Sequence, residues 1–417
     1  MGFQQGLSGL SAASKNLDVI GHNIANSGTT GFKSSRTEFA DVVASTMGAG
    51  GGQNAGIGVE VAAVAQQFSQ GNLTVTGNNM DVAINGNGFF RLQMPDGSAA
   101  YTRAGNFKVD KTGDLVTNGG ANVMGFKVDP ATGLGTSMPT VLSFPTGAPI
   151  AAKDTKSIFA TLNLDARANL AAGVPAAAGP PPTAAIPPTP RSTYGTSINV
   201  YDTQGVATPV NLYFEKSGAN EWQVFNTLDP AITTPVGTVK FDANGAYDPT
   251  STAISLTVTP ASNPNAPPVA NITAQLDLSQ TTQFGSKFAV ADLRQDGYAS
   301  GELTGINISN DGMVMASYSN GVTRAEAQVA LANFRNPQGL LAVGGNNWVE
   351  SFDSGPSVLG KPGDGTFGAL RSGALEESNV DLTAELVNMM TAQRAYQANA
   401  QTIKTQDQVL STMVNLR

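Results

Sequence analysis

The chain has 417 residues and a formal net charge of −8, and charged residues make up 13% of it, about half the usual share of ~25%. The acidic balance argues against a nucleic-acid partner. Zero cysteines exclude disulfides, thiolate metal sites and cysteine nucleophiles. One histidine, His22, leaves no His-rich metal site, and no apolar run is long enough to span a membrane. We therefore expect no cofactor, no metal ion and no membrane span.

The N-terminal segment has apolar or small residues in alternating steps of three and four, which predicts a helix with a heptad stripe. Ser14 and Gly21 occupy two of the stripe positions, so the stripe is thin. Its apolar members are Phe3, Leu7, Leu10, Leu17 and Ile24.

The C-terminal segment repeats the same spacing. No Gly or Pro follows Val380, so the helix could run for about 36 residues, on the order of 54 Å. Ser378 with Asp381 three residues later resembles a capping box. The apolar members of this second stripe are Leu382, Leu386, Met389, Tyr396, Ile403, Leu410 and Val414.

Two long terminal helices with narrow stripes predict an assembly element rather than an ordinary core. A core-facing helix usually carries a wider apolar face, and a lone helix with a narrow stripe is marginal in water. We expect the two helices to form a coiled-coil pair. We further expect their stripes to be buried against other chains, and to be unfolded before that assembly.

Between the helices the hydrophobic period falls to two, which indicates strands. Met80, Val82 and Ile84 alternate, and Asn320-Gly321 is a strong hairpin dipeptide. We expect residues 71–145 and 285–370 to form a β domain of the meander or barrel type.

Residues 146–284 predict a second, sandwich-like β domain that is inserted in the first. Val210, Leu212 and Phe214 alternate there, and residues 171–190 hold seven Pro and seven Ala, typical of an extended surface insertion. The expected fold is α+β and mainly β, with two nested β domains carried on the terminal helices. The remaining segments are expected to be the helical domain, residues 1–33 and 371–417, and a Gly-rich extended linker, residues 34–70, in which 48–58 is loop.

Two glycine motifs could belong to a nucleotide-using enzyme. Residues 355–361 spell GxxxxGK, but Pro362 follows where a Ser or Thr hydroxyl is needed, and 363–368 spell GxGxxG without a preceding strand. His22 lies on the predicted helix surface with Asp18 as its only nearby acid. The pair Glu376-Glu377 fits stabilisation of a helix N-terminus better than acid–base catalysis. We therefore expect no catalytic residue and no cofactor-binding residue.

Four short segments, in this order, resemble the bacterial flagellar rod and hook (axial) protein family. They are 12–26 with Thr30-Gly31-Phe32-Lys33; 80–90; 101–107; and 375–382 with 393–399. The family positions within them are Asn23, Asn26, Gly31, Phe32, Gly86, Gly88, Asn379 and Asp381. His22 departs from the family, which usually has Asn there.

The resemblance implies a structural, non-enzymatic subunit of the flagellum. Residues 201–205, with Trp222, are similar to the outer region of the hook-type members, and the inserted middle domain argues against the shorter distal rod subunit. Such subunits polymerise with themselves into a curved, hollow, flexible tube, a universal joint that transmits torque from rod to filament. A distal rod or other axial subunit, or a secreted β-rich adhesin, is the alternative.

The resemblance also implies where the subunit is placed and what it meets. The N-terminus lacks the basic start and apolar core of a secretory signal, and the family is exported unfolded through the flagellar type III export apparatus without a cleaved signal peptide. The expected location is the extracellular hook of the basal body. The implied partners are further copies of the chain, the distal rod protein, the hook cap and the hook–filament junction proteins.

Overall fold

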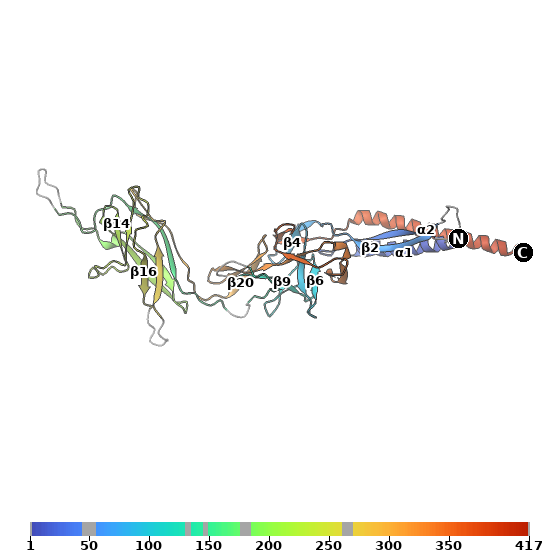
Figure 1. The fold of residues 1–417 in the computed structure, drawn as a ribbon, viewed down its shortest axis with the longest axis horizontal. Coiled ribbons are helices and arrows are strands. Elements are labelled where there is room, and N and C mark those ends of the chain that lie inside the picture. Colours follow the sequence, from blue (N-terminus) through green and yellow to red (C-terminus); the bar gives the residue numbers. More distant parts are fainter. Residues whose placement is uncertain are drawn as a thin grey trace. The chain divides into compact units, whose positions relative to one another are not determined.

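The computed structural model describes residues 2–43, 56–129, 135–144, 149–175, 185–260 and 270–415. The chain divides into two compact units (Figure 1). The first unit comprises Met1–Gly147, Thr304–Ser317 and Thr323–Arg417, and the second comprises Ala148–Leu303 and Tyr318–Val322. In sequence, the second unit is therefore inserted in the first.

Two helices belong to the first unit. Helix α1 (Gly2–Ala25) and helix α2 (Leu382–Asn415) pack against each other, as Figure 1 shows in blue and red. The rest of the described chain is strand, turn and loop, apart from two short 3-10 helices, Arg191–Thr193 and Pro337–Gly339. The expected fold class, mainly β with a pair of terminal helices, is confirmed.

A β-hairpin follows α1 where we expected a linker. Strand β1 (Ser35–Val43) pairs antiparallel with β2 (Gly56–Gln66), and both strands contact α1. The alternation of Val59 and Val61 suits a strand, and Gly56–Gly58 lies in β2 rather than in a loop. The segment 34–70, expected as a Gly-rich linker or extended region, is thus largely a paired hairpin in its described part, and residues 48–55 of the Gly-rich segment lie outside the described residues.

A sheet of 13 strands forms the β part of the first unit, with the central order β20-β21-β22-β9-β5-β6-β25-β24. The turn at Asn320-Gly321 joins β21 to β22, and Gly321 has φ 80°, so the hairpin prediction is confirmed. The strands are β5 (Phe89–Gln93), β6 (Ala99–Thr102), β7 (Lys108–Val109), β8 (Leu115–Val116), β9 (Asn122–Lys127), β10 (Thr140–Val141), β20 (Leu303–Ile308), β21 (Met313–Tyr318), β22 (Thr323–Val329), β23 (Leu331–Asn333), β24 (Leu341–Gly344), β25 (Asn347–Val349) and β26 (Val358–Gly360).

Two small antiparallel strand pairs connect the segment just before α2 to the segment that follows the β1–β2 hairpin. Strand β27 (Ala369–Ser372) pairs with β4 (Val82–Asn85), and β28 (Ala374–Glu376) pairs with β3 (Leu73–Val75). The expected helical domain at 371–417 therefore begins too early, because its first residues are strand and α2 starts only at Leu382.

An aromatic cluster is part of the core of the first unit. Phe89, Tyr101, Phe334 and Trp348 are buried together, and their rings meet edge to face at centroid distances of 4.8–5.9 Å. Phe68, which follows the hairpin, packs against Phe89 and Trp348. The core thereby fixes the segment that links the hairpin to the sheet.

Two sheets form the second unit. One has the order β16-β17-β11-β18 with β19 paired to β11, and the other has the order β12-β13-β14-β15. The strands are β11 (Ser157–Asp165), β12 (Gly195–Tyr201), β13 (Ala207–Gly218), β14 (Glu221–Phe225), β15 (Gly237–Lys240), β16 (Ile254–Val258), β17 (Ile272–Asp277), β18 (Thr282–Phe284) and β19 (Ala289–Gln295).

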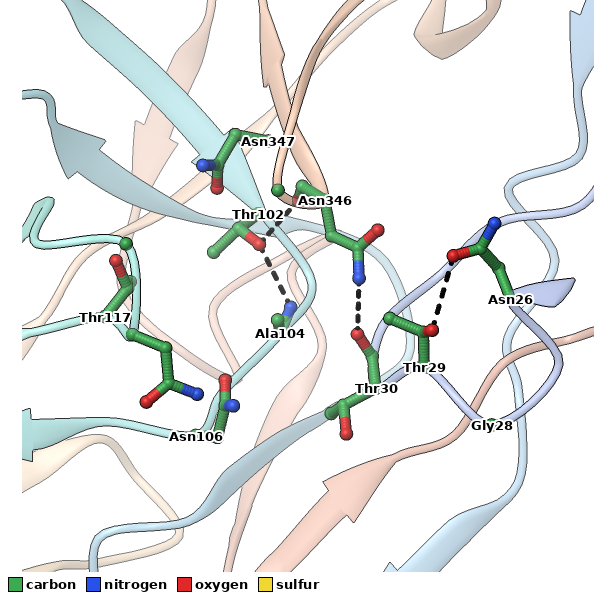
Figure 2. Close-up of a pocket in the computed structure, with 13 residues that line it drawn as sticks. Asn26, Gly28, Thr29, Thr30, Thr102, Ala104, Asn106, Thr117, Asn346 and Asn347 are labelled. Atoms are coloured by element: carbon green, nitrogen blue, oxygen red, sulfur yellow. Dashed lines mark hydrogen bonds between the residues drawn. The ribbon is translucent and has the colours of Figure 1, made fainter. Parts of the chain in front are cut away.

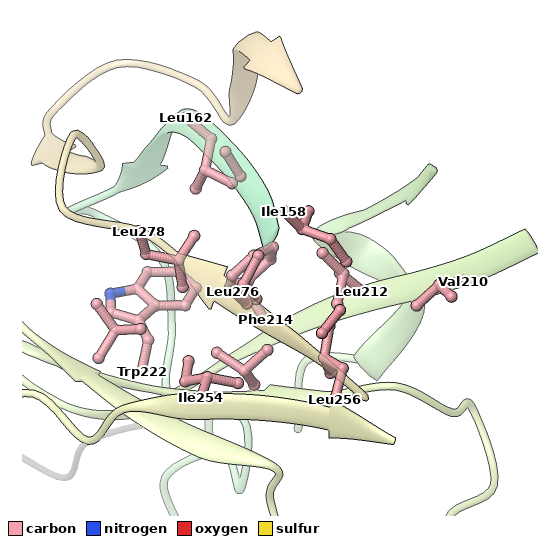
Figure 3. Close-up of a cluster of buried hydrophobic side chains, with 14 of the residues drawn as sticks. Ile158, Leu162, Val210, Leu212, Phe214, Trp222, Ile254, Leu256, Leu276 and Leu278 are labelled. Atoms are coloured by element: carbon pink, nitrogen blue, oxygen red, sulfur yellow. The ribbon is translucent and has the colours of Figure 1, made fainter. Parts of the chain in front are cut away.

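One hydrophobic core lies between these two sheets (Figure 3), which makes the second unit a sandwich. Ile158 and Leu256 come from one sheet, and Phe214 and Trp222 from the other. The boundary expected at 284 differs from the structure, because β19 pairs along β11 and places residues 285–303 in this unit. Of the Pro- and Ala-rich segment, residues 176–184 lie outside the described chain.

Replacing Gln283 by leucine is expected to destabilise the second unit by about 1–3 kcal/mol, because a buried donor would lose its acceptor. The Trp222 indole is fully buried and donates to Gln283 Oε1 at 2.8 Å. In a Trp348→Phe background, urea unfolding followed by the fluorescence of Trp222 measures the loss in the second unit. Gln275→Leu, at an exposed position of β17, is the matched control and should leave the midpoint unchanged; an equal loss in both variants would contradict the prediction.

Candidate assembly surface

Small residues of α1 form its contact with α2. A Cβ placed on Gly6 would lie 3.0 Å from Ile403 Cγ1, and one placed on Gly9 would lie 2.8 Å from Asn399 Oδ1. At the other end of α1, Asn23 Nδ2 donates to Glu385 Oε1 at 3.4 Å. Because low numbers of α1 meet high numbers of α2, the two helices are antiparallel. Glycines of α1 thus allow the side chains of Ile403 and Asn399 to approach its backbone closely.

The predicted stripe of α1 is only partly covered within the described chain. Phe3 is 45% exposed and Leu7 is 53% exposed, while Leu10, Leu17 and Ile24 are half-buried. The buried members of α1 are instead Gly6, Ala12, Ala13, Ile20 and Asn23. Of the large apolar side chains of the stripe, Phe3 and Leu7 are thus left available on the surface of the described chain, and the other three are partly covered.

The face of α2 that is buried in the first unit differs from the face that carries the predicted stripe. Ala392 is buried, and half-buried Glu385, Asn399 and Gln406 lie on the same face. The stripe shares only Met389 and Ile403 with this face, and Tyr396 is 37% exposed. Its other described members are exposed: Leu382 by 46%, Leu386 by 47% and Leu410 by 53%. The side chain of Val414 lies outside the described residues.

Asp381 caps the N-terminus of α2. Its Oδ1 accepts hydrogen bonds from Thr383 N at 2.9 Å and from Ala384 N at 3.1 Å. The expected capping box that begins at Ser378 is wrong, because the hydroxyl of that residue accepts from Val380 N, before the helix.

Asp381→Ala is expected to cost about 0.5–2 kcal/mol, because two amide groups of the first turn lose their acceptor. Amide hydrogen exchange of residues 383–386 should accelerate while the second unit is unchanged. Ser378→Ala is the matched control. Faster exchange in the control than in Asp381→Ala would contradict the assignment of the cap.

Glu376 connects three of the family segments inside the first unit. Its Oε1 lies 2.5 Å from Lys33 Nζ, its Oε2 lies 3.2 Å from Arg103 Nη1, and the exposure of the three side chains is 0–4%. Gly71 N also donates to Oε1 at 2.9 Å, and Gly31 N donates to the Glu376 carbonyl at 2.8 Å. The expected role of Glu376 at the helix N-terminus is therefore wrong: it is a buried counter-ion.

This buried cluster holds two cations and one carboxylate. Burial lowers the pKa of Lys33 and that of Arg103, and the Glu376 carboxylate opposes both changes. Lys33 Nζ also donates to the Ser69 carbonyl at 2.8 Å, and the Arg103 guanidinium lies 5.3 Å from the centre of the Phe89 ring. Sequence reasoning missed the cluster, although Lys33 and Arg103 each stand inside a segment that resembles the family.

Two asparagines join the helices to the chain around them. Asn23 exchanges hydrogen bonds with the backbone of Ser35 at 2.8 and 2.9 Å. Asn379 accepts from Ser34 N at 2.7 Å and donates to the carbonyls of Gln67 and Ser69. The start of the hairpin is thereby held from both ends of the chain.

The remaining family positions lie in turns. Gly31 has φ 70°, and a Cβ there would lie 2.6 Å from Ala104 N, so a larger residue has no room. Asn26 donates to the His22 carbonyl at 2.9 Å, and Phe32 is buried. Gly86 and Gly88 lie in the turn between β4 and β5 and also have positive φ.

A polar pocket of about 680 Å3 lies beside the turn that follows α1 (Figure 2). Asparagine, threonine, glycine and alanine line it, without a charged side chain. Asn346, with φ 58°, donates to the Thr30 carbonyl at 2.8 Å, and Thr102 Oγ1 donates to the Asn346 carbonyl at 2.8 Å. These contacts connect the turn after α1 to the β part of the unit.

The residues and motifs considered for catalysis do not form a site in the described chain. His22 is exposed on α1, with its ring 5.5 Å from that of Phe32. Residues 363–368 connect β26 to β27, so a strand follows the GxGxxG motif where a dinucleotide site has a helix. Among the residues with described placement, no three His, Cys, Asp or Glu side chains could hold a metal ion, and no helix is long and apolar enough to cross a membrane.

Four family models match the chain. They are "Flagella basal body rod protein" at residues 3–33, "Flagellar hook protein FlgE/F/G D1 domain" at 83–156, "Flagellar basal body protein FlaE D2 domain" at 163–298 and "Flagellar basal body rod FlgEFG protein C-terminal" at 371–416. The third of these falls within the second unit, and the first and last cover the helices.

Similar proteins match over the full length. The chain is 42% identical to flagellar hook protein FlgE of Salmonella typhimurium over 429 residues and to that of Escherichia coli over 425 residues, with 100% of each chain covered. It is 35% identical to FlgE of Rhizobium meliloti, covering 100% of this chain and 98% of the relative. The crystal structure of Helicobacter pylori flagellar hook protein FlgE2 shares the fold, with a TM-score of 0.51, 18% identity, and coverage of 73% of this chain and 100% of that one. The chain therefore belongs to the flagellar hook protein family and is a structural, non-enzymatic subunit of the bacterial flagellum that assembles with copies of itself.

Proposed function

We propose that the exposed faces of α1 and α2 are the surfaces through which copies of this chain assemble into the hook. The observation that carries the proposal is the exposure of large apolar side chains on a helix pair in which glycines of α1 permit close contact with α2. Leu7, Leu386 and Leu410 are each about half exposed. Burying one leucine fully contributes about 1.5–3 kcal/mol, from which the cost of ordering the helices is subtracted.

The polymer built in this way is a curved, hollow, flexible tube that transmits torque from the rod to the filament. Its terminal neighbours are the distal rod protein at one end and the hook–filament junction proteins at the other, and it grows under the hook cap. The subunit travels unfolded through the flagellar type III export apparatus without a cleaved signal peptide. The absence of cysteine suits this route, because no thiol can oxidise during export.

Electron microscopy of basal bodies from cells that lack this gene tests the proposed function. Complete rods that stop without a hook are expected, and the unmodified gene supplied in trans should restore the hook. Rods truncated before the outer ring would indicate a rod subunit instead. Intact hooks and filaments in the deletion strain would contradict the proposal altogether.

A further inference from the structure

A groove runs between α1 and β2 on the side of α1 away from α2. It comprises two hollows of about 580 and 220 Å3 that share Lys15 and Asp18 in their linings. Ser11 and Val61 line the larger hollow, and Val64 lines the smaller one. We call this feature the α1–β2 groove. Its lining mixes serines with small and β-branched apolar residues, and its charged side chains are Lys15, Asp18 and Glu60.

The far end of α2 extends past its partner helix. The described part of α1 continues about 6 Å beyond Gly6, whereas α2 continues about 18 Å beyond Ile403, at 1.5 Å per residue. We call residues 404–413 the α2 tail. In this tail Val409, Leu410 and Met413 are 54%, 53% and 65% exposed. The tail is thus a mainly polar segment whose three apolar side chains are exposed in the described chain.

The charges of the groove and of the tail are complementary. Lys15 and Asp18 are three residues apart on α1, and Lys404 and Asp407 are three residues apart on α2. All four side chains are exposed, and within the described residues none of them forms an ion pair. Two antiparallel helices with this spacing bring Lys15 opposite Asp407 and Asp18 opposite Lys404.

One chain cannot make this match by itself. The contacts of Gly6 with Ile403 and of Asn23 with Glu385 place Lys15 opposite a residue near 394. Asp407 lies about 20 Å further along α2. The match therefore requires a second copy that is displaced by about 20 Å along the helix axis.

We propose that the α2 tail of one subunit lies in the α1–β2 groove of a neighbouring subunit. This inference rests on the proposed function and names which segments meet. The apolar side chains of the tail supply most of the attraction, because exposed ion pairs add little affinity. The two ion pairs select the register, since a shift of one helical turn brings like charges together.

Disulfide cross-linking tests the register, because the chain has no cysteine of its own. Hooks assembled from Lys15→Cys/Asp407→Cys subunits should yield a ladder of covalent multimers on mild oxidation. A bond within one chain is excluded by the ~20 Å separation, since a disulfide needs Cα atoms within about 7 Å. Each single-cysteine variant is the matched control and should give no ladder.

Charge exchange tests the same contact without a cross-link. Lys15→Asp/Asp18→Lys alone and Lys404→Asp/Asp407→Lys alone should each reduce hook number at least tenfold, and the combination should restore it. The first exchange combined with Asp292→Arg/Arg294→Asp, an exposed pair of the second unit, should not restore it. Normal hooks that give no ladder, cross-links to a different protein, or failure of the combined exchange to rescue would overturn the inference while leaving the hook function intact. Absence of hooks from the unmodified chain would instead overturn the proposed function.

Discussion

Replacing Glu376 by glutamine is expected to destabilise the first unit by about 3–5 kcal/mol, which is a large part of the stability of an ordinary domain. Lys33 and Arg103 are 0% and 4% exposed and share this carboxylate. Glutamine keeps the shape but removes the charge, so two buried cations would remain without a counter-ion. The turn after α1, the segment around Arg103 and strand β28 would lose their common contact.

The two tryptophans allow this effect to be assigned to one unit. Trp348 lies in the first unit and Trp222 in the second, and the chain has two tryptophans in all. In a Trp222→Phe background, urea unfolding followed by fluorescence reports on the first unit alone. Glu377→Gln, an exposed neighbour, is the matched control. A midpoint for Glu376→Gln equal to that of the control would show that the buried cluster does not stabilise the fold.

Replacing Leu386 by aspartate is expected to abolish hooks while both units remain folded. The side chain is 47% exposed, so the change costs the isolated subunit little. In the polymer, a buried aspartate would lack a partner, and such a buried charge costs several kcal/mol per subunit. Because every subunit carries the change, the cost recurs at each step of growth.

Hook number by electron microscopy and subunit folding by circular dichroism measure this prediction together. Gln397→Asp places the same charge at another exposed position of α2 and is the matched control. Loss of hooks in both variants would mean that any negative charge on α2 blocks assembly. Hooks of normal number and length from Leu386→Asp would show that this face stays in water, against the proposed assembly surface.

The helices and most strands could be predicted from the sequence because hydrophobic period is a local property. The steps of three and four residues at both ends predict helices, and Asn320-Gly321 predicts its hairpin from two residues. The side of α2 that packs on α1 could not be predicted in the same way. Gly6 and Gly9 permit close approach of the helices. Prediction from the spacing of large apolar residues does not identify glycines as contact positions.

The hairpin β1–β2 was missed because its glycines indicate loop while its valines indicate strand. The register has irregularities at Glu38/Phe39 and Val42/Val43, which disturb a strict alternation. The boundary of the second unit was placed too early because β19 is almost wholly exposed. An exposed edge strand has no apolar pattern, and its place depends on pairing with β11, more than 120 residues earlier in the chain.

The buried cluster of Lys33, Arg103 and Glu376 could not be predicted from hydrophobic periodicity. Lys33, Arg103 and Glu376 are separated by 70 or more residues, and each reads as an ordinary surface charge in its own segment. Only the fold brings both cations within 3.2 Å of the Glu376 carboxylate. The resemblance of the three segments to one family marks them as related but does not say that they touch.

Electron cryomicroscopy of hooks assembled from this chain tests the central claim most directly. We expect neighbouring copies in the tube to bury Leu386 and Leu410, which are 47% and 53% exposed in the isolated subunit. We also expect the helices to remain paired at Gly6 and Ile403. A hook whose subunits touch only through their β units, with both leucines still in water, would contradict it.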